Sequence, residues 1–400
     1  MRVSRLALTD FRNYRSADVA FEPGANLLVG RNGQGKTNIV ESLVWIATGS
    51  SHRVPTDVAL IRAGEQRAIV RCTVTNDERS FQLDVELNAK GANRAQANGN
   101  GVRIRDLPRY LQAVLFSPED LQLVRADPAG RRRFLDELAV MRAPRLAGVH
   151  SDLDRVLRQR NSLLKSARAS RLREDELTTL EVWDGRLVEL GLEVLRTRQA
   201  LVADLAPHVA EAYRVVAGDE HRAEIALVTN VPADAEAFRA LLAQRRRDEL
   251  DRGVSLVGPH RDDLELQLNG LLARHYASHG ESWSFALALR LASAQLLRDG
   301  SGGDPVMILD DVFAELDAGR RQRLAEAAGG FEQVLITAAV EDDVPEALRD
   351  HRIRIDAGVV VEAGAAARTP VERAGDPDVD PDAEAVVGVD ERADAEAVDG

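Results

Sequence analysis

A glycine-rich segment near the N-terminus contains the residue types that bind a nucleoside triphosphate. GRNGQGKT, from Gly30 to Thr37, fits Gly-x-x-x-x-Gly-Lys-Ser/Thr, in which glycines let backbone N–H groups surround a β-phosphate. In this pattern Lys36 reaches the β- and γ-phosphates, and the Thr37 hydroxyl is a ligand for Mg²⁺. The segment predicts an ATP–Mg²⁺ site with Lys36 as a catalytic residue. Its predicted nucleotide-binding residues are Gly30, Arg31, Asn32, Gly33, Gln34, Gly35, Lys36 and Thr37.

Two adjacent carboxylates late in the chain supply the second half of such a site. In PVMILDDVFAELD, Pro305 to Asp317, four apolar residues predict a buried strand that ends in Asp310 and Asp311. Open α/β sheets bind ligands at the carboxyl ends of their strands. We expect Asp310 to hold the metal and Asp311 to act as general base or to orient water. A capped turn explains the same residues when they are taken alone.

A third segment places a helix N-terminus where a phosphate could bind. YASHGESWSFALALRLA, from Tyr276 to Ala292, contains Ser-x-Gly-Glu before a long apolar helix. Taken alone, it predicts only an N-capped helix. Beside the two nucleotide motifs, it looks like the turn that ABC-type ATPases press onto the γ-phosphate of the opposing subunit. The residues of this predicted signature turn are Ser278, Gly280 and Glu281.

On both sides of these motifs, the spacing of apolar residues predicts strands and helices. A strand over 26–29 and a helix over 36–48 enclose the glycine-rich segment, and buried strands are expected over 306–309 and 333–336. The first 130 residues are strand-rich, with residues 91–101 expected to be a loop because of their composition. Further expected elements are strands over 224–228, 254–257 and 264–268 and helices over 233–250 and 284–297.

The middle of the chain has a different pattern. Leucines and valines recur at spacings of three and four on both sides of a polar break near Ser170, which predicts an arginine-rich helical hairpin with a first arm of about 25 residues. The fold class is therefore α/β: an ABC-type P-loop ATPase head assembled from both ends of the chain, with an inserted helical arm and a disordered acidic tail. The predicted boundaries are 1–127 and 252–365 for the head, 128–251 for the arm, and 366–400 for the tail.

Charge and composition exclude several classes of protein. The net charge of −13 is concentrated at the C-terminus: residues 370–400 hold eleven acids and two arginines, a net of −9, which leaves −4 for the other 369 residues. A near-neutral body permits a local basic face for nucleic acid. The single cysteine, Cys72, argues against a disulfide framework and a thiolate metal site. No apolar run approaches the roughly 18 residues of a membrane span, and no signal peptide is evident, so we expect a cytoplasmic protein without a membrane partner.

Four segments together resemble the RecF family, bacterial recombination-mediator ATPases related to SMC and ABC ATPases. They are LTDFRNYRS, GRNGQGKTNIVESL, residues 118–136 and ILDDVFAELDAGRRQRL, and GPHRDDLEL at residues 258–266 is also similar. The resemblance covers residues 1 to about 360. It implies a weak ATPase that forms a homodimer on ATP and binds duplex DNA near single-stranded gaps. The implied task is help in recombinase loading during DNA replication, DNA repair and the SOS response to DNA damage, with RecR-like and RecO-like partners.

The resemblance also assigns residues and shows departures. Arg12 and Asn13 would contact the nucleotide, although an ordinary surface turn explains them too. Asp311 stands where the wider ABC class usually has glutamate, and the shorter side chain makes slow hydrolysis reasonable. After the last core strand, Thr337 and Ala338 stand where many ABC ATPases place a histidine. The sequence does not identify a glutamine-loop residue.

Three consecutive arginines at the start of a helix have two explanations. Arg131, Arg132 and Arg133 could bind DNA phosphates, or they could form salt bridges with nearby acids. His260 has no second histidine or cysteine at ligand spacing, so it is interpreted as structural.

Two other functional classes remain as alternatives. An ATPase subunit of a membrane transporter would have no use for the segment over residues 118–136. An SMC-like chromosome-tethering protein would need much longer coiled coils than this arm provides.

Overall fold

The computed structural model describes residues 1–364 apart from 77–78, 171–177, 219 and 301, and the predicted acidic tail lies outside the described residues. Residues Met1–Ala365 form one compact unit. The boundaries at residues 127 and 251 therefore remain predictions, and the following paragraphs concern this unit alone.

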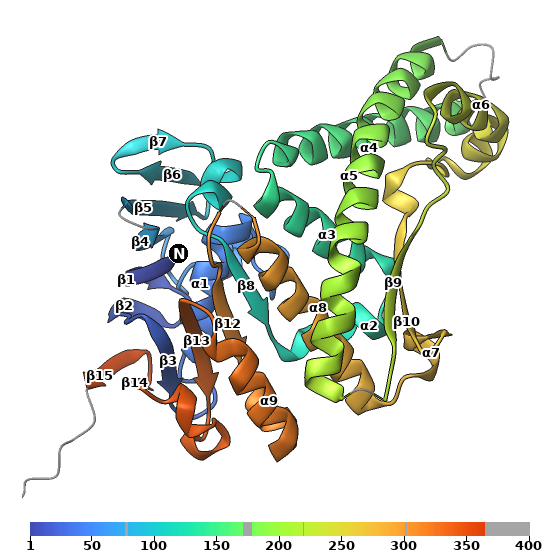
Figure 1. Ribbon diagram of the computed structural model, residues 1–400. Helices are drawn as coiled ribbons and strands as arrows, with labels where there is room; N and C mark the ends of the chain where they lie inside the picture. Colours follow the sequence, from blue (N-terminus) through green and yellow to red (C-terminus); the bar gives the residue numbers. More distant parts are fainter. Residues whose placement is uncertain (77–78, 171–177, 219, 301, 365–400) are drawn as a thin grey trace, which may run out of the picture. The chain divides into compact units, whose positions relative to one another are not determined.

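An antiparallel sheet is built mainly from the first hundred residues (Figure 1). Apolar and polar side chains alternate along its strands, so that one face is buried. The loop expected over residues 91–101 is wrong, because Asn98 and Gly99 take φ of +50° and +77° and turn the chain into a hairpin. In spatial order the strands are β2 (Tyr14–Ala20), β1 (Arg2–Phe11), β4 (Arg67–Asn76), β5 (Arg79–Asn88), β6 (Arg94–Ala97) and β7 (Asn100–Val102).

The second sheet confirms that strands from both ends of the chain build one head. Its N-terminal strand β3 (Gly24–Val29) lies between two strands from the last seventy residues. Five of the six strands run parallel, as buried apolar runs favour, and only the edge strand β15 is antiparallel. In spatial order the other strands are β15 (Val359–Gly364) and β14 (His351–Asp356) on one side of β3, and β13 (Gln333–Ala338), β12 (Val306–Asp310) and β8 (Ala113–Phe116) on the other.

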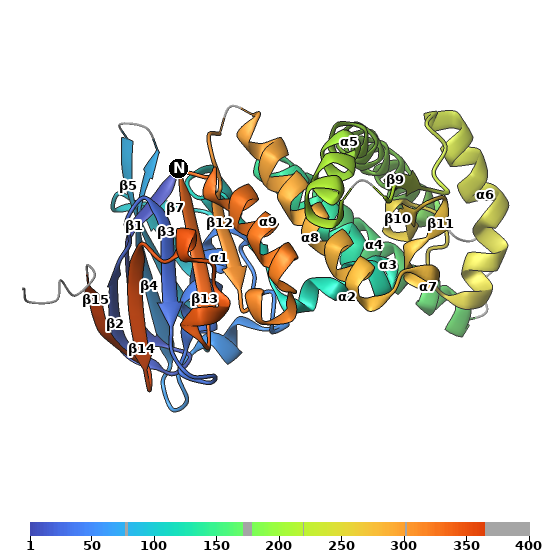
Figure 2. The same cartoon turned by 60° about the horizontal axis from the view of Figure 1, so that its bottom comes forward.

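Two hydrophobic cores cover the faces of this second sheet. Helix α1 (Lys36–Thr48), whose bounds match the predicted helix, lies in the core shared by the two sheets. Helices α8 (His279–Arg298) and α9 (Ala318–Gly329) lie in the other core, on the opposite face (Figure 2). The motif-bearing strands β3 and β12 are therefore buried on both sides.

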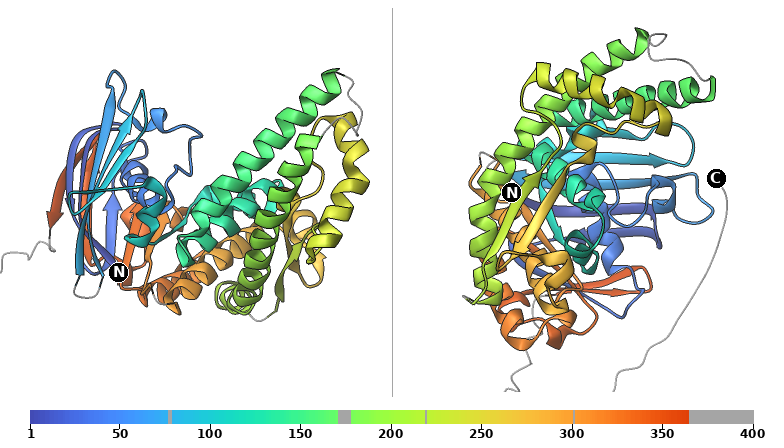
Figure 3. Two further views of the ribbon diagram at one scale, coloured as in Figure 1. Left: turned by 90° about the horizontal axis from the view of Figure 1, so that it is seen from above. Right: turned by 90° about the vertical axis from the view of Figure 1, so that its right-hand side faces the viewer.

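The predicted helical hairpin is confirmed as α4 (Leu146–Ser170) packed against α5 (Thr178–Ala217). The first part of α5 packs with α4 and α6 (Ala235–Arg252) in a separate small core, whereas its C-terminal half belongs to the same core as α8. Figure 3 shows α4, α5 and α6, in green and yellow, away from the two sheets. The remaining helices are α2 (Leu121–Arg125), α3 (Pro128–Arg142) and α7 (Ala273–Tyr276), and the third sheet is β11 (Leu271–Leu272), β10 (Asp263–Leu268) and β9 (Ala223–Val228).

The strand predicted over residues 254–257 is wrong. Gly253, with φ of +68°, ends α6, and the Val254 N–H donates to Glu249 O at 3.2 Å. The next two N–H groups donate to side chains, Ser255 to Asn161 at 2.7 Å and Leu256 to Glu249 at 2.7 Å. No neighbouring strand is then needed to satisfy them. The short 3₁₀ turns elsewhere are Asp57–Leu60, Ile104–Arg109, Pro118–Asp120, Pro259–Arg261, Phe313–Glu315, Glu341–Asp343 and Glu346–Leu348.

The helices of the described ranges include none with the length and apolar character needed to cross a membrane.

Candidate nucleotide-binding site

The glycine-rich segment forms a loop between the end of β3 and the start of α1, as its motif predicts. We call residues 30–37 the phosphate loop. Gly33 and Gly35 have φ of +81° and +115°, which side chains rarely allow. Backbone N–H groups of this loop and the positive end of the α1 dipole are the groups that bind phosphate in such turns.

Lys36 folds back over the phosphate loop. Its side chain is buried, and Nζ donates to the carbonyl oxygens of Gly30 at 2.7 Å and Arg31 at 3.1 Å. Burial lowers the pKa of Lys36, while the charges of Asp311 and Asp310 oppose that shift. The Lys36 ammonium is thus held against the backbone of the loop, and the charges of the two predicted carboxylates favour it.

Asp310 and Thr37, the two predicted metal ligands, meet although they are 273 residues apart. Thr37 Oγ1 and Thr337 Oγ1 donate to Asp310 Oδ1 at 3.0 and 2.6 Å. Burial raises the pKa of Asp310, and the two hydroxyls act against that shift. A nearby cation would lower the cost of the buried charge. The carboxylate and hydroxyl are the hard oxygen donors that suit Mg²⁺, which usually needs only one or two protein ligands beside the phosphates.

Asp311 has an unusual backbone conformation. Its φ is +54°, and its N–H donates to Thr337 O at 3.2 Å and Thr337 Oγ1 at 3.0 Å. Such a conformation is uncommon outside glycine and often marks functional sites. Thr337, which the sequence singled out only because no histidine stands there, therefore binds the side chain of Asp310 and the backbone of Asp311. Asp311 is half-buried, and its negative charge favours the protonated form of Lys36.

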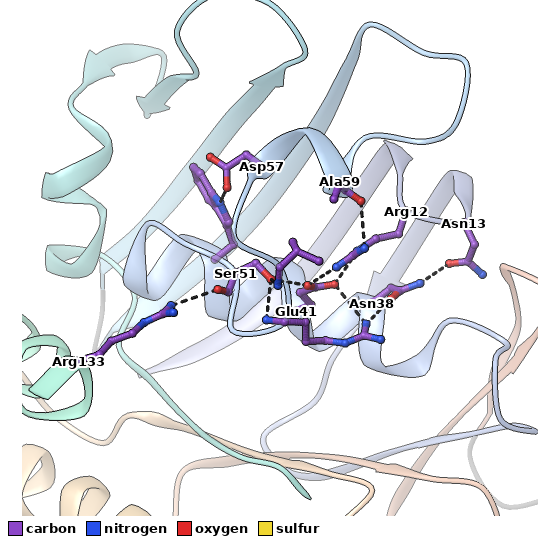
Figure 4. A network of polar contacts seen from close by, with 11 residues as sticks. Arg12, Asn13, Asn38, Glu41, Ser51, Asp57, Ala59 and Arg133 are labelled. Carbon is purple, nitrogen blue, oxygen red and sulfur yellow. Dashed lines mark hydrogen bonds and ion pairs between the residues drawn. The ribbon is translucent and has the colours of Figure 1, made fainter. Parts of the chain in front are cut away.

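Arg12 and Asn13 lie in the β1–β2 turn and bind different neighbours: Figure 4 shows Arg12 with Glu41 and Ala59, and Asn13 with Asn38. Asn13 Nδ2 donates directly to the Gln34 carbonyl at 3.0 Å. Arg12 instead forms a two-pronged ion pair with Glu41 of α1, at 2.8 and 2.7 Å, and donates to Ala59 O at 3.0 Å. Arg12 thus connects the β1–β2 turn to α1. Its contact with a nucleotide remains a prediction.

Glu41 is a site residue that sequence reasoning missed. Its side chain is fully buried and accepts hydrogen bonds from Arg12 and, at 2.6 Å, from Ser51 Oγ. Burial alone would raise the pKa of Glu41, but the hydrogen bonds from Arg12 and Ser51 outweigh it, and the pKa lies below its ordinary value. In the sequence, the only indication of this role was an acidic residue among the apolar positions of the predicted helix over 36–48.

The signature turn, residues 278–281, caps α8 as predicted. Ser278 N–H donates to Glu281 Oε2 at 2.7 Å, and Glu281 N–H donates to Ser278 Oγ at 3.3 Å. A Cβ on Gly280 would lie 3.0 Å from the Arg320 guanidinium, a neighbour on α9 that the sequence did not reveal. Among the described residues, no hydrogen bond or ion pair joins this turn to the phosphate loop of the same chain, and α1 and α8 lie on opposite faces of the sheet.

The three consecutive arginines have three different environments. Arg131 is buried and forms a two-pronged ion pair with Asp263 at 2.7 and 3.0 Å, which favours the salt-bridge explanation for this residue. Arg132 donates to Asp262 O at 2.7 Å. Arg133 has a half-exposed side chain that pairs with Glu137 at 2.7 Å. It also donates to Ser50 Oγ at 3.0 Å and Ser51 O at 3.1 Å, and of the three arginines it alone is exposed.

We expect Arg131→Ala to lower the free energy of unfolding by about 3 kcal/mol, because it removes a buried guanidinium that pairs with Asp263 and donates to Leu123 O and Ala126 O. Arg133→Ala, the matched change in the same helix, should cost less than about 1 kcal/mol because its ion pair is exposed. Urea unfolding followed by circular dichroism measures both. Equal losses in the two variants would contradict the different roles assigned to these arginines.

His260 has the structural environment that the sequence indicated. Its Nε2 lies 3.1 Å from Ser255 O, and burial lowers its pKa to about 4. Within the described ranges, no group of three or more histidine, cysteine, aspartate or glutamate side chains could hold a metal ion. A Mg²⁺ at Asp310 and Thr37 would therefore depend on phosphate oxygens for further ligands.

Comparison with known proteins gives one consistent family. The family model described as the RecF/RecN/SMC N terminal domain matches residues 2–359. The chain is 54% identical over 389 residues to the DNA replication and repair protein RecF of Clavibacter sepedonicus, covering 91% of this chain and 95% of that protein. It is 55% identical over 383 residues to the RecF of Leifsonia xyli subsp. xyli, covering 90% and 100%.

Solved structures agree with this family. A structure of the recombination mediator protein RecF with ATP in the RecFOR pathway has a TM-score of 0.82 and 27% identity, covering 90% of this chain and 96% of that chain. An SMC head bound to the C-terminal winged-helix domain of ScpA has a TM-score of 0.53 and 16% identity, covering 90% and 96%, and shows the shared fold.

Proposed function

Because this chain belongs to the RecF family of SMC-related ATPases, we propose that it is an ATP-dependent DNA-binding clamp that acts in DNA replication and recombinational repair. The observation that carries the proposal is the convergence of Lys36, Thr37, Asp310 and Asp311 at one end of the parallel sheet. These are the side chains that a P-loop ATPase needs, and they come from two segments far apart in the sequence.

We propose that two copies bind two ATP molecules between them. Each phosphate loop binds ATP from its own copy, and each signature turn binds the γ-phosphate held by the other copy. The absence of a hydrogen bond or ion pair between the two motifs within the described part of one chain supports this arrangement. A capped helix N-terminus with a glycine close to it is a suitable phosphate-binding surface.

Each site residue then has a task in hydrolysis. Thr37 and Asp310 would hold Mg²⁺, which when bound neutralises phosphate charge. Lys36 stabilises negative charge on the β- and γ-phosphates, and Asp311 orients the attacking water and accepts its proton. The short carboxylate of Asp311 supports weak ATPase activity. Loss of the γ-phosphate removes the group that links the copies, so the dimer opens and releases DNA.

Membership of the family supports the biological setting. We propose that the closed homodimer binds duplex DNA near single-stranded gaps in the cytoplasm and helps load a recombinase during the SOS response to DNA damage. Partners of the RecR and RecO kinds fit this task, since the structural relative is a mediator of the RecFOR pathway. Arg133 is the candidate DNA contact among the three consecutive arginines.

A DNA-binding titration with ATP, ADP and no nucleotide tests the function. We expect retention of gapped duplex DNA with ATP–Mg²⁺, together with a mass corresponding to two chains in light scattering, and weak retention with ADP. Affinity should fall as salt rises, because phosphate contacts release counterions. Equal DNA binding in all three states would contradict the clamp. Co-purification with membranes instead of DNA would favour the transporter alternative.

A further inference from the structure

The phosphate loop is held tightly by neighbouring protein on two sides. A Cβ on Gly30 would lie 2.2 Å from the Ile355 carbonyl oxygen of β14. A Cβ on Gly35 would lie 2.6 Å from Tyr14 Oη and 2.8 Å from the side chain of Asn13. Real Cβ atoms do not approach this closely, so glycine is required at both positions by the fold itself, before any phosphate is bound.

The turn between β14 and β15 binds the middle of the same loop. Ala357 N–H donates to Gln34 Oε1, and Gly358 N–H donates to Gln34 O at 3.0 Å. Asn13 Nδ2 donates to that same carbonyl oxygen, also at 3.0 Å. Three donors from two turns therefore bind Gln34. Because the peptide unit is planar, hydrogen bonds to the Gln34 carbonyl also restrict the direction of the Gly35 N–H in the same peptide unit.

Ala357 occupies this turn at a conformational cost. It has φ of +46° and is followed by Gly358 at +76°. The turns at Asn98–Gly99 and Asn269–Gly270 have nearly the same angles but use asparagine at the first position. Asparagine tolerates the left-handed conformation, whereas alanine has no polar side chain to compensate for it. The hydrogen bond to Gln34 compensates here, and strain of this kind is found where a site constrains the backbone.

We propose that the β14–β15 turn is part of the nucleotide-binding site, with Ala357 and Gly358 as positioning residues that act through Gln34 on the phosphate loop. The inference rests on the proposed binding of nucleotide at that loop. Because the loop is already held in one conformation, less conformational entropy is lost when phosphate binds. Releasing Gln34 should therefore weaken ATP and ADP alike, since both have the β-phosphate.

The test compares three variants with the full-length protein. Gln34→Ala removes the acceptor of the Ala357 N–H. Gly358→Ala places a Cβ 3.1 Å from Asn13 O, whereas the control Gly99→Ala has the same left-handed strain but no atom within 4 Å of its Cβ. Calorimetric titration measures ADP and ATP dissociation constants, steady-state kinetics measures KM and kcat, and thermal unfolding measures stability.

We expect Gln34→Ala and Gly358→Ala to weaken both nucleotides by about five-fold and to raise KM by a similar factor. Gly99→Ala should lower the unfolding temperature and leave the dissociation constants as they were. Unchanged affinities in Gln34→Ala would overturn the proposal, as would an equal loss of affinity in Gly99→Ala. If the unsubstituted protein bound neither nucleotide, the proposed function itself would fail.

Discussion

Replacing Lys36 with methionine should abolish nucleotide binding, ATP-induced dimerisation and DNA retention together. Methionine roughly preserves the side-chain stem but removes the cation that the phosphate loop holds in place. Hydrogen bonds from a charged group to phosphate contribute about 1.5–3 kcal/mol each, so losing two should weaken ATP at least about a hundred-fold. Calorimetric titration measures binding, and light scattering with ATP–Mg²⁺ measures dimerisation.

The chain offers a matched control, since Lys90 is an exposed lysine near the end of the first sheet. Lys90→Met should leave all three properties unchanged. The fold of Lys36→Met should also survive, because burial lowers the pKa of Lys36 and its removal relieves the cost of a buried charge. Normal ATP-dependent dimerisation of Lys36→Met would contradict the two-copy arrangement.

Asp310→Asn and Asp311→Asn should separate metal-dependent binding from hydrolysis. Asp310→Asn removes the charge that would hold Mg²⁺, so ATP binding and dimerisation should weaken. Asp311→Asn should spare binding but slow hydrolysis by about a hundred-fold or more, since a general base contributes on that order. Dimers would then accumulate in the closed state, with prolonged residence on DNA. Size-exclusion chromatography with light scattering and a phosphate-release assay measure the two effects.

Both substitutions suit the local structure. Asparagine tolerates the left-handed conformation of Asp311, and at Asp310 it keeps a carbonyl oxygen for Thr37 and Thr337. Because burial raises the pKa of Asp310, its ionised form costs stability at neutral pH, so Asp310→Asn without nucleotide should unfold at the same or a higher temperature. Equal dimerisation of the two variants, or unchanged hydrolysis by Asp311→Asn, would show that the carboxylates do not have separate tasks.

Local patterns predicted much of this protein. Eight consecutive residues specify the phosphate loop, and the apolar spacing after it predicted the helix over 36–48 with its observed bounds. The buried runs at 306–309 and 333–336 became parallel strands because their side chains are apolar on both faces. Composition failed at 91–101, where positive φ at two residues makes a hairpin, and apolar character failed at 254–257, where side chains satisfy the backbone.

The amino-acid sequence by itself determined the nucleotide motifs, the main strands and helices, and the family, because each depends on residues close together in the chain. Only the tertiary structure decided how their side chains pair. It placed Thr37 on Asp310 across 273 residues, and Gln34 on Ala357 across 323. It also gave three consecutive arginines different partners: Arg131 is in a buried ion pair, Arg132 donates to a backbone carbonyl, and the exposed Arg133 pairs with Glu137. A local pattern specifies which direction a side chain faces, but its partner depends on which distant segment the packed core brings to that face.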